Sequence, residues 1–233
     1  MLREIVLDTE TTGLDPDAGH RLVEIGCVEL LNHIPTGRSF HRYINPERDM
    51  PAEAFAVHGL SAQFLADKPV FAQIAEEFLA FVEDARLVIH NAAFDMAFLN
   101  AELKRLGKPP FGPDRAVDTL LLARRRHPGG PNRLDDLCQR YGIDNSRRTK
   151  HGALLDAELL AEVYIELIGG RQAALVLDAE AQRLAETAVS PVAYGPRPAP
   201  LAPRLTDAER AAHRTFVASL GEGAVWRRYL SED

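Results

Sequence analysis

Short aliphatic runs alternate with longer amphipathic stretches along the first 170 residues. Five runs rich in β-branched and aliphatic side chains predict strands, near residues 3–9, 22–31, 38–45, 86–90 and 115–118. Apolar positions spaced three or four residues apart predict five helices, near residues 71–84, 94–106, 118–127, 133–141 and 152–168. Three early strands followed by alternating helices and strands predict an α/β domain over residues 1–170, with a mixed sheet flanked by helices.

The pattern changes after Gly169-Gly170, which we expect to end the last helix of this domain. Residues 171–190 have moderate helical character and form a candidate binding segment. Residues 191–204 follow as a linker, which is predicted to be stiff because five prolines lie in it.

The remaining tail, residues 205–233, begins with a predicted helix. Thr206 and Glu209 have the spacing of a capping box, and Gly221 follows the last helical position. The only tryptophan of the chain, Trp226, lies beyond the linker, where it cannot easily join the main core. An exposed tryptophan suits a binding anchor for a partner; packing against its own short helix is the alternative.

Net charge argues against a strong, independent binder of nucleic acid. The chain carries −7, and residues 171–233 are neutral, so the negative charge falls on residues 1–170. Phosphate contacts dominate nonspecific affinity for nucleic acids, so a chain with this balance would meet DNA together with a partner. The best candidates for backbone contact are the basic clusters at 124–126 and 147–150. A solvated helix face is an equal alternative for the first cluster.

The two cysteines, Cys27 and Cys138, lie far apart in apolar surroundings and read as buried thiols of a reducing compartment. No stretch has the length of a membrane span, and no signal-peptide pattern precedes the first strand. We therefore expect a cytoplasmic protein without a membrane partner.

Two carboxylates stand at the end of the first predicted strand. Asp8 and Glu10 follow the apolar run Ile5-Val6-Leu7, and Gly13 supplies a turn soon after. Residues i and i+2 of a strand project from the same face, so both carboxylates point together while Thr9 points away. Their repulsion and desolvation need an offset, and Mg²⁺ or Mn²⁺ suits such hard oxygen ligands. A simple turn with an N-cap is the alternative.

Two later segments add acidic groups and a histidine. Asp95 follows the predicted strand at 86–90 and opens a helical pattern, where a plain helix-terminal role would also suit it. Asp156 begins the last helix of the domain, and His151 precedes it by five residues. That spacing does not place His151 and Asp156 on one helix face, so we expect His151 on the entry loop.

Four convergent carboxylates would make a site for two divalent cations, Mg²⁺ or Mn²⁺. Such a site activates water and stabilises the leaving oxygen in phosphoryl displacement. A histidine beside it can take the proton of the attacking water, because its unperturbed pKa lies near neutral pH. The catalytic candidates are therefore Asp8, Glu10, Asp95, His151 and Asp156.

The spacing Asp8-x-Glu10, Asp95 and His151-x4-Asp156 resembles the three motifs of the DEDD exonucleases, in their histidine-bearing branch. Further phrases resemble the proofreading epsilon subunits of bacterial DNA polymerase III, among them Val57-His58-Gly59 and Leu134-Asp135-Asp136-Leu137-Cys138. The resemblance covers residues 3–170. It implies a ribonuclease-H-like fold and a metal-dependent 3′→5′ exonuclease that proofreads DNA synthesis.

The resemblance also implies substrate contacts. Glu53 and His58 would contact the terminal nucleotide at the 3′ end of DNA, beside Thr11 and the metal ligands. Phe94 and the turn Gly13-Leu14 would form walls for its base. His58 and a further histidine, His90, could instead be structural, hydrogen-bonded residues.

Partner sites are implied for the C-terminal part. Gln172, Leu175 and Leu177 resemble a degenerate peptide that binds the sliding clamp, and the tail with Trp226 would bind the polymerase (alpha) subunit. Two alternatives stay open: an RNA-trimming exonuclease, since the motifs do not distinguish sugars, and an architectural adaptor between clamp and polymerase.

Overall fold

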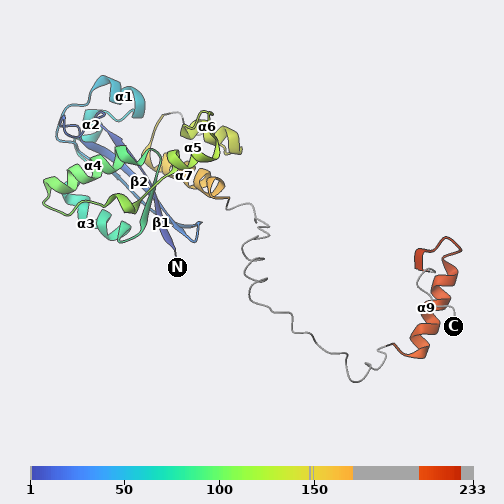
Figure 1. The fold of residues 1–233 in the computed structure, drawn as a ribbon. Coiled ribbons are helices and arrows are strands. Elements are labelled where there is room, and N and C mark those ends of the chain that lie inside the picture. Colours follow the sequence, from blue (N-terminus) through green and yellow to red (C-terminus); the bar gives the residue numbers. More distant parts are fainter. Residues whose placement is uncertain (1, 147, 149, 170–204, 227–233) are drawn as a thin grey trace. The chain divides into compact units, whose positions relative to one another are not determined.

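The computed structural model describes residues 2–146, 148, 150–169 and 205–226 (Figure 1). The chain divides into two compact units, Met1–Leu175 and Val176–Asp233. The candidate clamp residues Gln172, Leu175 and Leu177 and the prolines of the linker lie outside the described residues.

The first unit is built on one five-stranded sheet with the order β3-β2-β1-β4-β5. The strands are β1 (Arg3–Thr11), β2 (Leu22–Leu31), β3 (Ile34–Tyr43), β4 (Arg86–Ile89) and β5 (Ala116–Asp118). The pairs β1–β2 and β2–β3 are antiparallel, and β1–β4 and β4–β5 are parallel. The predicted mixed sheet is therefore confirmed.

The third strand was predicted at 38–45 and begins earlier, at Ile34. A two-residue turn at Asn32 and His33 explains the difference, because both residues adopt positive φ, 49° and 65°, and Leu31 pairs with Ile34. Such a turn matches the twist of a hairpin. The early part of β3 is exposed, so no buried apolar pattern marked it.

Helices cover both faces of the sheet. They are α1 (Ala52–His58), α2 (Ala62–Leu65), α3 (Phe71–Val82), α4 (Ala92–Arg105), α5 (Thr119–Arg126), α6 (Leu134–Tyr141) and α7 (Ala153–Leu167), with a 3₁₀ turn at Pro113–Arg115. The five predicted helices of the domain are confirmed. The short helices α1 and α2 were not predicted. In α1, Phe55 and Val57 are exposed while His58 is buried, so the apolar residues do not mark the buried face of the helix.

Alternation along β1 sorts the core into two layers. Ile5 and Leu7 pack with α3 and α4 on one face of the sheet. Val6 packs on the other face with Leu160 and Tyr164 of α7. Asp8 and Glu10 continue the face of Val6, towards α7, and Thr9 continues the face of Leu7, towards α4. The predicted opposite orientation of Thr9 is thereby confirmed.

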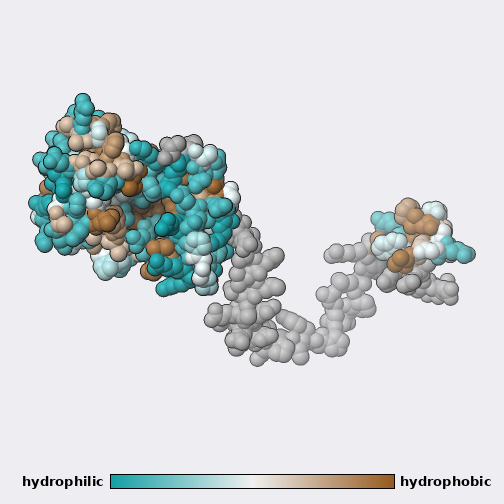
Figure 2. All heavy atoms as spheres, turned by 90° about the horizontal axis from the view of Figure 1, so that it is seen from above, coloured by the Kyte–Doolittle hydropathy of each residue, from teal (hydrophilic) through white to brown (hydrophobic). Residues whose placement is uncertain are grey.

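The second unit contains α9 (Asp207–Ser219). The predicted capping box is confirmed, since the amide of Glu209 donates to Thr206 Oγ1 (3.3 Å) and the amide of Thr206 donates to Glu209 Oε2 (2.8 Å). Trp226 lies edge-on to His213 with ring centroids 6.5 Å apart, yet it remains 58% exposed. Apolar side chains gather on the surface of this unit (Figure 2), including Phe216, Leu220 and Val225.

In the part of the chain that the structure describes, every helix is too short or too polar to cross a membrane.

Candidate active site

The carboxylates converge where β1 and β4 end. Because these two strands are parallel, their carboxyl ends lie at the same edge of the sheet. A left-handed residue, Asn91 (φ 65°), turns the chain sharply from β4 into α4 and sets Asp95 in the first helical turn. Thr9 Oγ1 donates to Asp95 Oδ1 at 2.6 Å, which fixes the buried Asp95 against the end of β1.

Helix α7 brings the third segment to the same place. A glycine in β2 allows this approach, since a Cβ on Gly26 would lie 2.2 Å from the backbone of Ala153. Gly26 is also the strand partner of Asp8, so the first turn of α7 lies directly over the end of β1. Asp156 is in that first turn and is 2% exposed.

His151 lies before α7 on the entry loop, as predicted. Its amide donates to the carbonyl of Val57 (3.4 Å), which ties the loop to α1, and its side chain is 48% exposed. One ligand atom from each of Glu10, His151 and Asp156 lies within 4.8 Å of the other two. Three segments that are distant in sequence thus place possible metal-ligand atoms around one point.

Burial and mutual repulsion dominate the electrostatics of this cluster. Burial, with the charges of Asp156 and Glu24, raises the pKa of Glu10 to about 8. Burial raises the pKa of Asp95 to about 7, although the hydrogen bond from Thr9 opposes the shift. The pKa of Asp8 is raised well above its ordinary value by burial and by Asp95 and Glu10. These carboxylates therefore need an added positive charge to be ionised together at neutral pH.

Asp156 behaves differently because a cation is beside it. Burial opposes ionisation, but hydrogen bonds and charge from Arg148 lower the pKa of Asp156. Arg148 donates from Nε to Asp156 Oδ1 (2.6 Å) and from Nη2 to Asp156 Oδ2 (2.8 Å). The sequence indicated Arg148 only as part of a basic cluster for DNA, and the structure turns it inward instead.

Two hollows flank the carboxylates. The larger, about 770 Å³, is bounded by the acidic cluster and by basic side chains of α5 and of the loops around α6, namely Asp8, Asp156, His151, Arg124, Arg133 and Arg148 among others. The smaller, about 500 Å³, is lined by Glu10 and by the loop that follows β1. Its lining contains most residues expected at the terminal nucleotide, Glu10, Thr11, Gly13, Leu14, Glu53, His58 and Phe94, whereas Asp8 and Asp156, also expected there, line the larger cavity. The residues expected around the terminal base thus share one cavity.

His58 presents a polar atom to that smaller cavity. Its Nδ1 accepts from the amide of Leu60 (3.0 Å), so a neutral ring carries its proton on Nε2. Nε2 is buried and makes no hydrogen bond of normal geometry among the described residues, although the backbone of Thr11 is close enough to interact with the ring. Burial lowers the pKa of His58, which keeps the ring neutral, and the contact with Thr11 opposes this shift only in part. A buried donor with no well-formed hydrogen bond is a group that a bound ligand can satisfy.

His90 has protein partners instead. Its Nδ1 lies 2.9 Å from Thr119 Oγ1, and burial lowers its pKa. These contacts fit the alternative that His90 is a structural, hydrogen-bonded residue.

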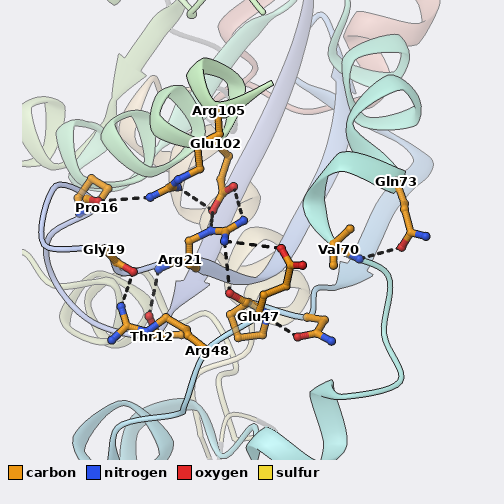
Figure 3. Close-up of polar contacts among 12 residues, drawn as sticks. Thr12, Pro16, Gly19, Arg21, Glu47, Arg48, Val70, Gln73, Glu102 and Arg105 are labelled. Carbon is orange, nitrogen blue, oxygen red and sulfur yellow. Dashed lines mark hydrogen bonds and ion pairs between the residues drawn. The ribbon is translucent and has the colours of Figure 1, made fainter. Parts of the chain in front are cut away.

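A buried ion pair braces the loop that closes the smaller cavity (Figure 3). Arg21 donates from Nε and Nη2 to the two oxygens of Glu102 in α4, at 2.6 and 3.0 Å. Its amide donates to Thr12 Oγ1 (3.0 Å), and Arg105 reaches both Glu102 and the carbonyl of Pro16. The loop after β1 is thereby fixed to α4, the helix that also carries Phe94 and Asp95. Sequence reasoning missed this network, because no local spacing links residues 21 and 102.

The other described residues of the two basic clusters, 124–126 and 147–150, contact different parts of the protein. Arg126 donates to the carbonyl of Leu167 (2.7 Å) at the end of α7, while Arg124 faces the larger cavity. Lys150 lies over the ring of Phe55, 5.2 Å from its centroid. Arg147 and Thr149 lie outside the described residues.

Known proteins resemble this chain in sequence and in fold. Residues 5–164 match the RNase T family, described as exonucleases. The chain is 50% identical over 222 residues to the DNA polymerase III subunit epsilon of Rickettsia felis, covering 94% of this chain and 97% of the relative. It is 48% identical over 189 residues to that subunit of Escherichia coli, covering 78% of each.

Solved structures agree on the fold. Exonuclease X in complex with 5′-overhanging duplex DNA aligns with a TM-score of 0.55 at 25% identity, over 73% of this chain and 92% of that one. The nuclease domain of 3′hExo, a DEDDh family member bound to rAMP, aligns with a TM-score of 0.61 at 16% identity, over 72% and 92%. The predicted DEDD exonuclease fold is confirmed.

These matches bear out the resemblance seen in the motifs, and they extend through most of the chain. The chain belongs to the epsilon-subunit family of bacterial DNA polymerase III, the proofreading 3′→5′ exonucleases of the histidine-bearing, metal-dependent DEDD branch.

Proposed function

We propose that Asp8, Glu10 and Asp156 hold two divalent cations, Mg²⁺ or Mn²⁺, with Asp95 in support partly through water. The observation that carries this assignment is the convergence of Glu10, His151 and Asp156, whose ligand atoms lie within 4.8 Å of one another. Carboxylate oxygens are the ligands these hard cations prefer. The raised pKa values of Glu10 and Asp95 fit as well, because an added positive charge would offset their repulsion.

When bound, such cations lower the pKa of water and stabilise the leaving oxygen of a phosphodiester. The protein supplies the remaining chemistry. His151 is the general base: it is half exposed, it borders the acidic cluster, and its loop position lets the ring face incoming water. Its proton then passes to solvent, which reaches the same cavity.

The smaller cavity is the site for the 3′-terminal nucleotide. Phe94 and Leu14 provide apolar surface for the base, and His58 Nε2 offers a buried donor. Glu53 and Thr11 line the same cavity beside Glu10, so the scissile phosphate would lie at the carboxylates when the base is seated.

In this proposal the parts of the chain have different functions. Residues 1–170 form the nuclease, 171–190 a segment for the sliding clamp, 191–204 a linker and 205–233 a tail for the polymerase subunit alpha. The exposed Trp226 with Phe216 and Val225 supports an apolar interface on the tail. As part of a replicase, the protein would act in the cytoplasm.

Nuclease assays with matched substrates test this proposal. The purified chain would be given 5′-labelled single-stranded DNA or RNA of the same sequence with Mg²⁺. We expect stepwise shortening of DNA from the 3′ end, abolished in Asp8→Ala and Asp156→Ala. Asp84→Ala, which removes an exposed carboxylate just before β4 at the other end of that strand, should keep wild-type activity.

More than a few per cent of activity in either ligand variant would refute the metal assignment. Faster shortening of RNA than of DNA would favour an RNA-trimming enzyme, and the mRNA stem-loop bound by the structurally similar 3′-exonuclease makes RNA a necessary arm of the assay.

A further inference from the structure

Arg148 is enclosed by acceptors of the active site. It lies on the connection between α6 and α7, and its side chain is only 8% exposed. Beyond the two bonds to Asp156, Nη1 donates to Asp135 Oδ2 at 2.7 Å. Nη2 also lies 2.6 Å from Nδ1 of His151. One guanidinium therefore contacts a carboxylate assigned to the metals and the assigned general base.

The pairing with Asp156 uses both carboxylate oxygens. A fork of this kind is among the strongest side-chain interactions, because two charge-assisted bonds form in one plane. The same oxygens are the ones that a divalent cation would need. A guanidinium and a divalent cation repel each other at such distances, so a cation bound at Asp156 and the pairing with Arg148 weaken each other.

The contact with His151 has a consequence for proton transfer. An arginine N–H only donates, so the 2.6 Å contact uses the lone pair of His151 Nδ1. The same nitrogen lies 3.3 Å from Asp156 Oδ2, an oxygen that Arg148 Nη2 also contacts. Arg148 and Asp156 therefore make opposite demands on this nitrogen, and the contact with Arg148 is the shorter one.

We propose that Arg148 is an internal cation that occupies Asp156 and His151 in the metal-free enzyme and is exchanged for divalent cations when the site is loaded. This inference rests on the proposed metal site. Asp135 gives Arg148 a second anchor, since its side chain is 55% exposed at the rim of the same cavity. The guanidinium can thus leave Asp156 and stay paired, while both site residues become available together.

Metal titration without DNA tests the exchange. Mn²⁺ binding would be measured by calorimetry for the full chain and for Arg148→Gln, Arg148→Lys and Arg124→Gln. We expect Arg148→Gln to bind Mn²⁺ about tenfold more tightly than wild type, because no cation has to be displaced. Arg148→Lys should be intermediate, since it keeps the charge but loses the fork. Arg124→Gln removes a positive charge from the same cavity and should change affinity less than about threefold.

Thermal unfolding gives an independent readout. In EDTA, Arg148→Gln should melt below wild type, because Asp156 loses its partner, and excess Mn²⁺ should abolish that difference. Unchanged or weaker Mn²⁺ binding in Arg148→Gln, or a melting difference that persists in Mn²⁺, would overturn the inference and leave Arg148 as a structural residue. Absence of Mn²⁺ binding in wild type and variants alike would instead refute the proposed metal site.

Discussion

At the residue scale, burial of the Glu10 carboxyl is unfavourable for folding of the metal-free protein once that carboxyl is ionised. Its carboxyl is 8% exposed and has a pKa of about 8 when folded, against an ordinary value of 4.5. Below about pH 4.5 both folded and unfolded chains hold the proton. Between about pH 4.5 and 8 the folded chain binds a proton that the unfolded chain has released. The free energy of unfolding of the metal-free protein should therefore fall as pH rises through this window.

Denaturant unfolding in EDTA from pH 5 to 9 checks this expectation. Glu10→Gln should make the dependence less steep, leaving the contributions of Asp95, below about pH 7, and of Asp8, whose pKa is also raised. Saturating Mg²⁺ should flatten it in wild type as well. A metal-free protein whose stability rises between pH 5 and 8 would contradict the assigned burial of these carboxyls.

His151 is the proposed general base. His151→Ala should lower turnover by roughly 10²–10⁴-fold, the usual contribution of a positioned general base. The change removes an exposed side chain, so folding should be preserved. Initial rates from pH 5.5 to 9 would be measured for both proteins. The acidic limb should be lost in the variant, and an unchanged profile would assign the base to another group.

Gly26 shows how an element-scale contact builds the site. Any side chain there meets the backbone of Ala153, so α7 must move and carry Asp156 away from β1. Gly26→Ala should cost about 1–3 kcal/mol of stability, as overpacking does, and should lower activity strongly. Gly152→Ala is the steric control: its Cβ meets nothing within 4 Å and its φ is −156°, so the expected cost is only that of alanine at an N-cap, about 0.5–1 kcal/mol. Chemical denaturation of both variants measures the contrast, and equal costs would remove Gly26 from this role.

The sequence predicted the elements that have a regular apolar pattern and the site residues that belong to motifs. Asp8, Glu10 and Asp95 come after aliphatic runs, so the pattern predicted that they stand at strand ends, and the set of motifs suggested that they converge. Helix α1 could not be inferred in this way, because its buried residue is a histidine and its aromatic Phe55 faces solvent. The inward turn of Arg148 was also out of reach, since a basic residue near a nuclease motif fits phosphate contact equally well. Which acidic residue pairs with a basic residue far away in the sequence depends on the tertiary structure.

At the scale of the whole molecule, the proposed catalytic site and the proposed partner-binding surface belong to different units. Every proposed catalytic residue lies in the first unit, and the exposed Trp226 lies in the second. Deleting residues 190–233 should leave hydrolysis of single-stranded DNA nearly unchanged and abolish association with the polymerase subunit. Trp226→Ala should weaken that association by about 2 kcal/mol or more, as expected of a buried aromatic anchor.

Calorimetric titration against the purified polymerase subunit would measure both. The double variant Gln172→Ala with Leu175→Ala is the control, because it should weaken only clamp binding. A truncated core that binds the polymerase at full affinity would refute the assignment of the tail.

Counting the bound cations tests the account most directly. Equilibrium dialysis with Mn²⁺ and a nucleoside 5′-monophosphate, the product of the reaction, would give the number held per chain. We predict two for wild type and at most one for Asp8→Asn and for Asp156→Asn, since each variant removes a charged ligand and preserves side-chain shape. Two cations retained by both variants, or none bound by wild type, would contradict the claim that these carboxylates form the metal site.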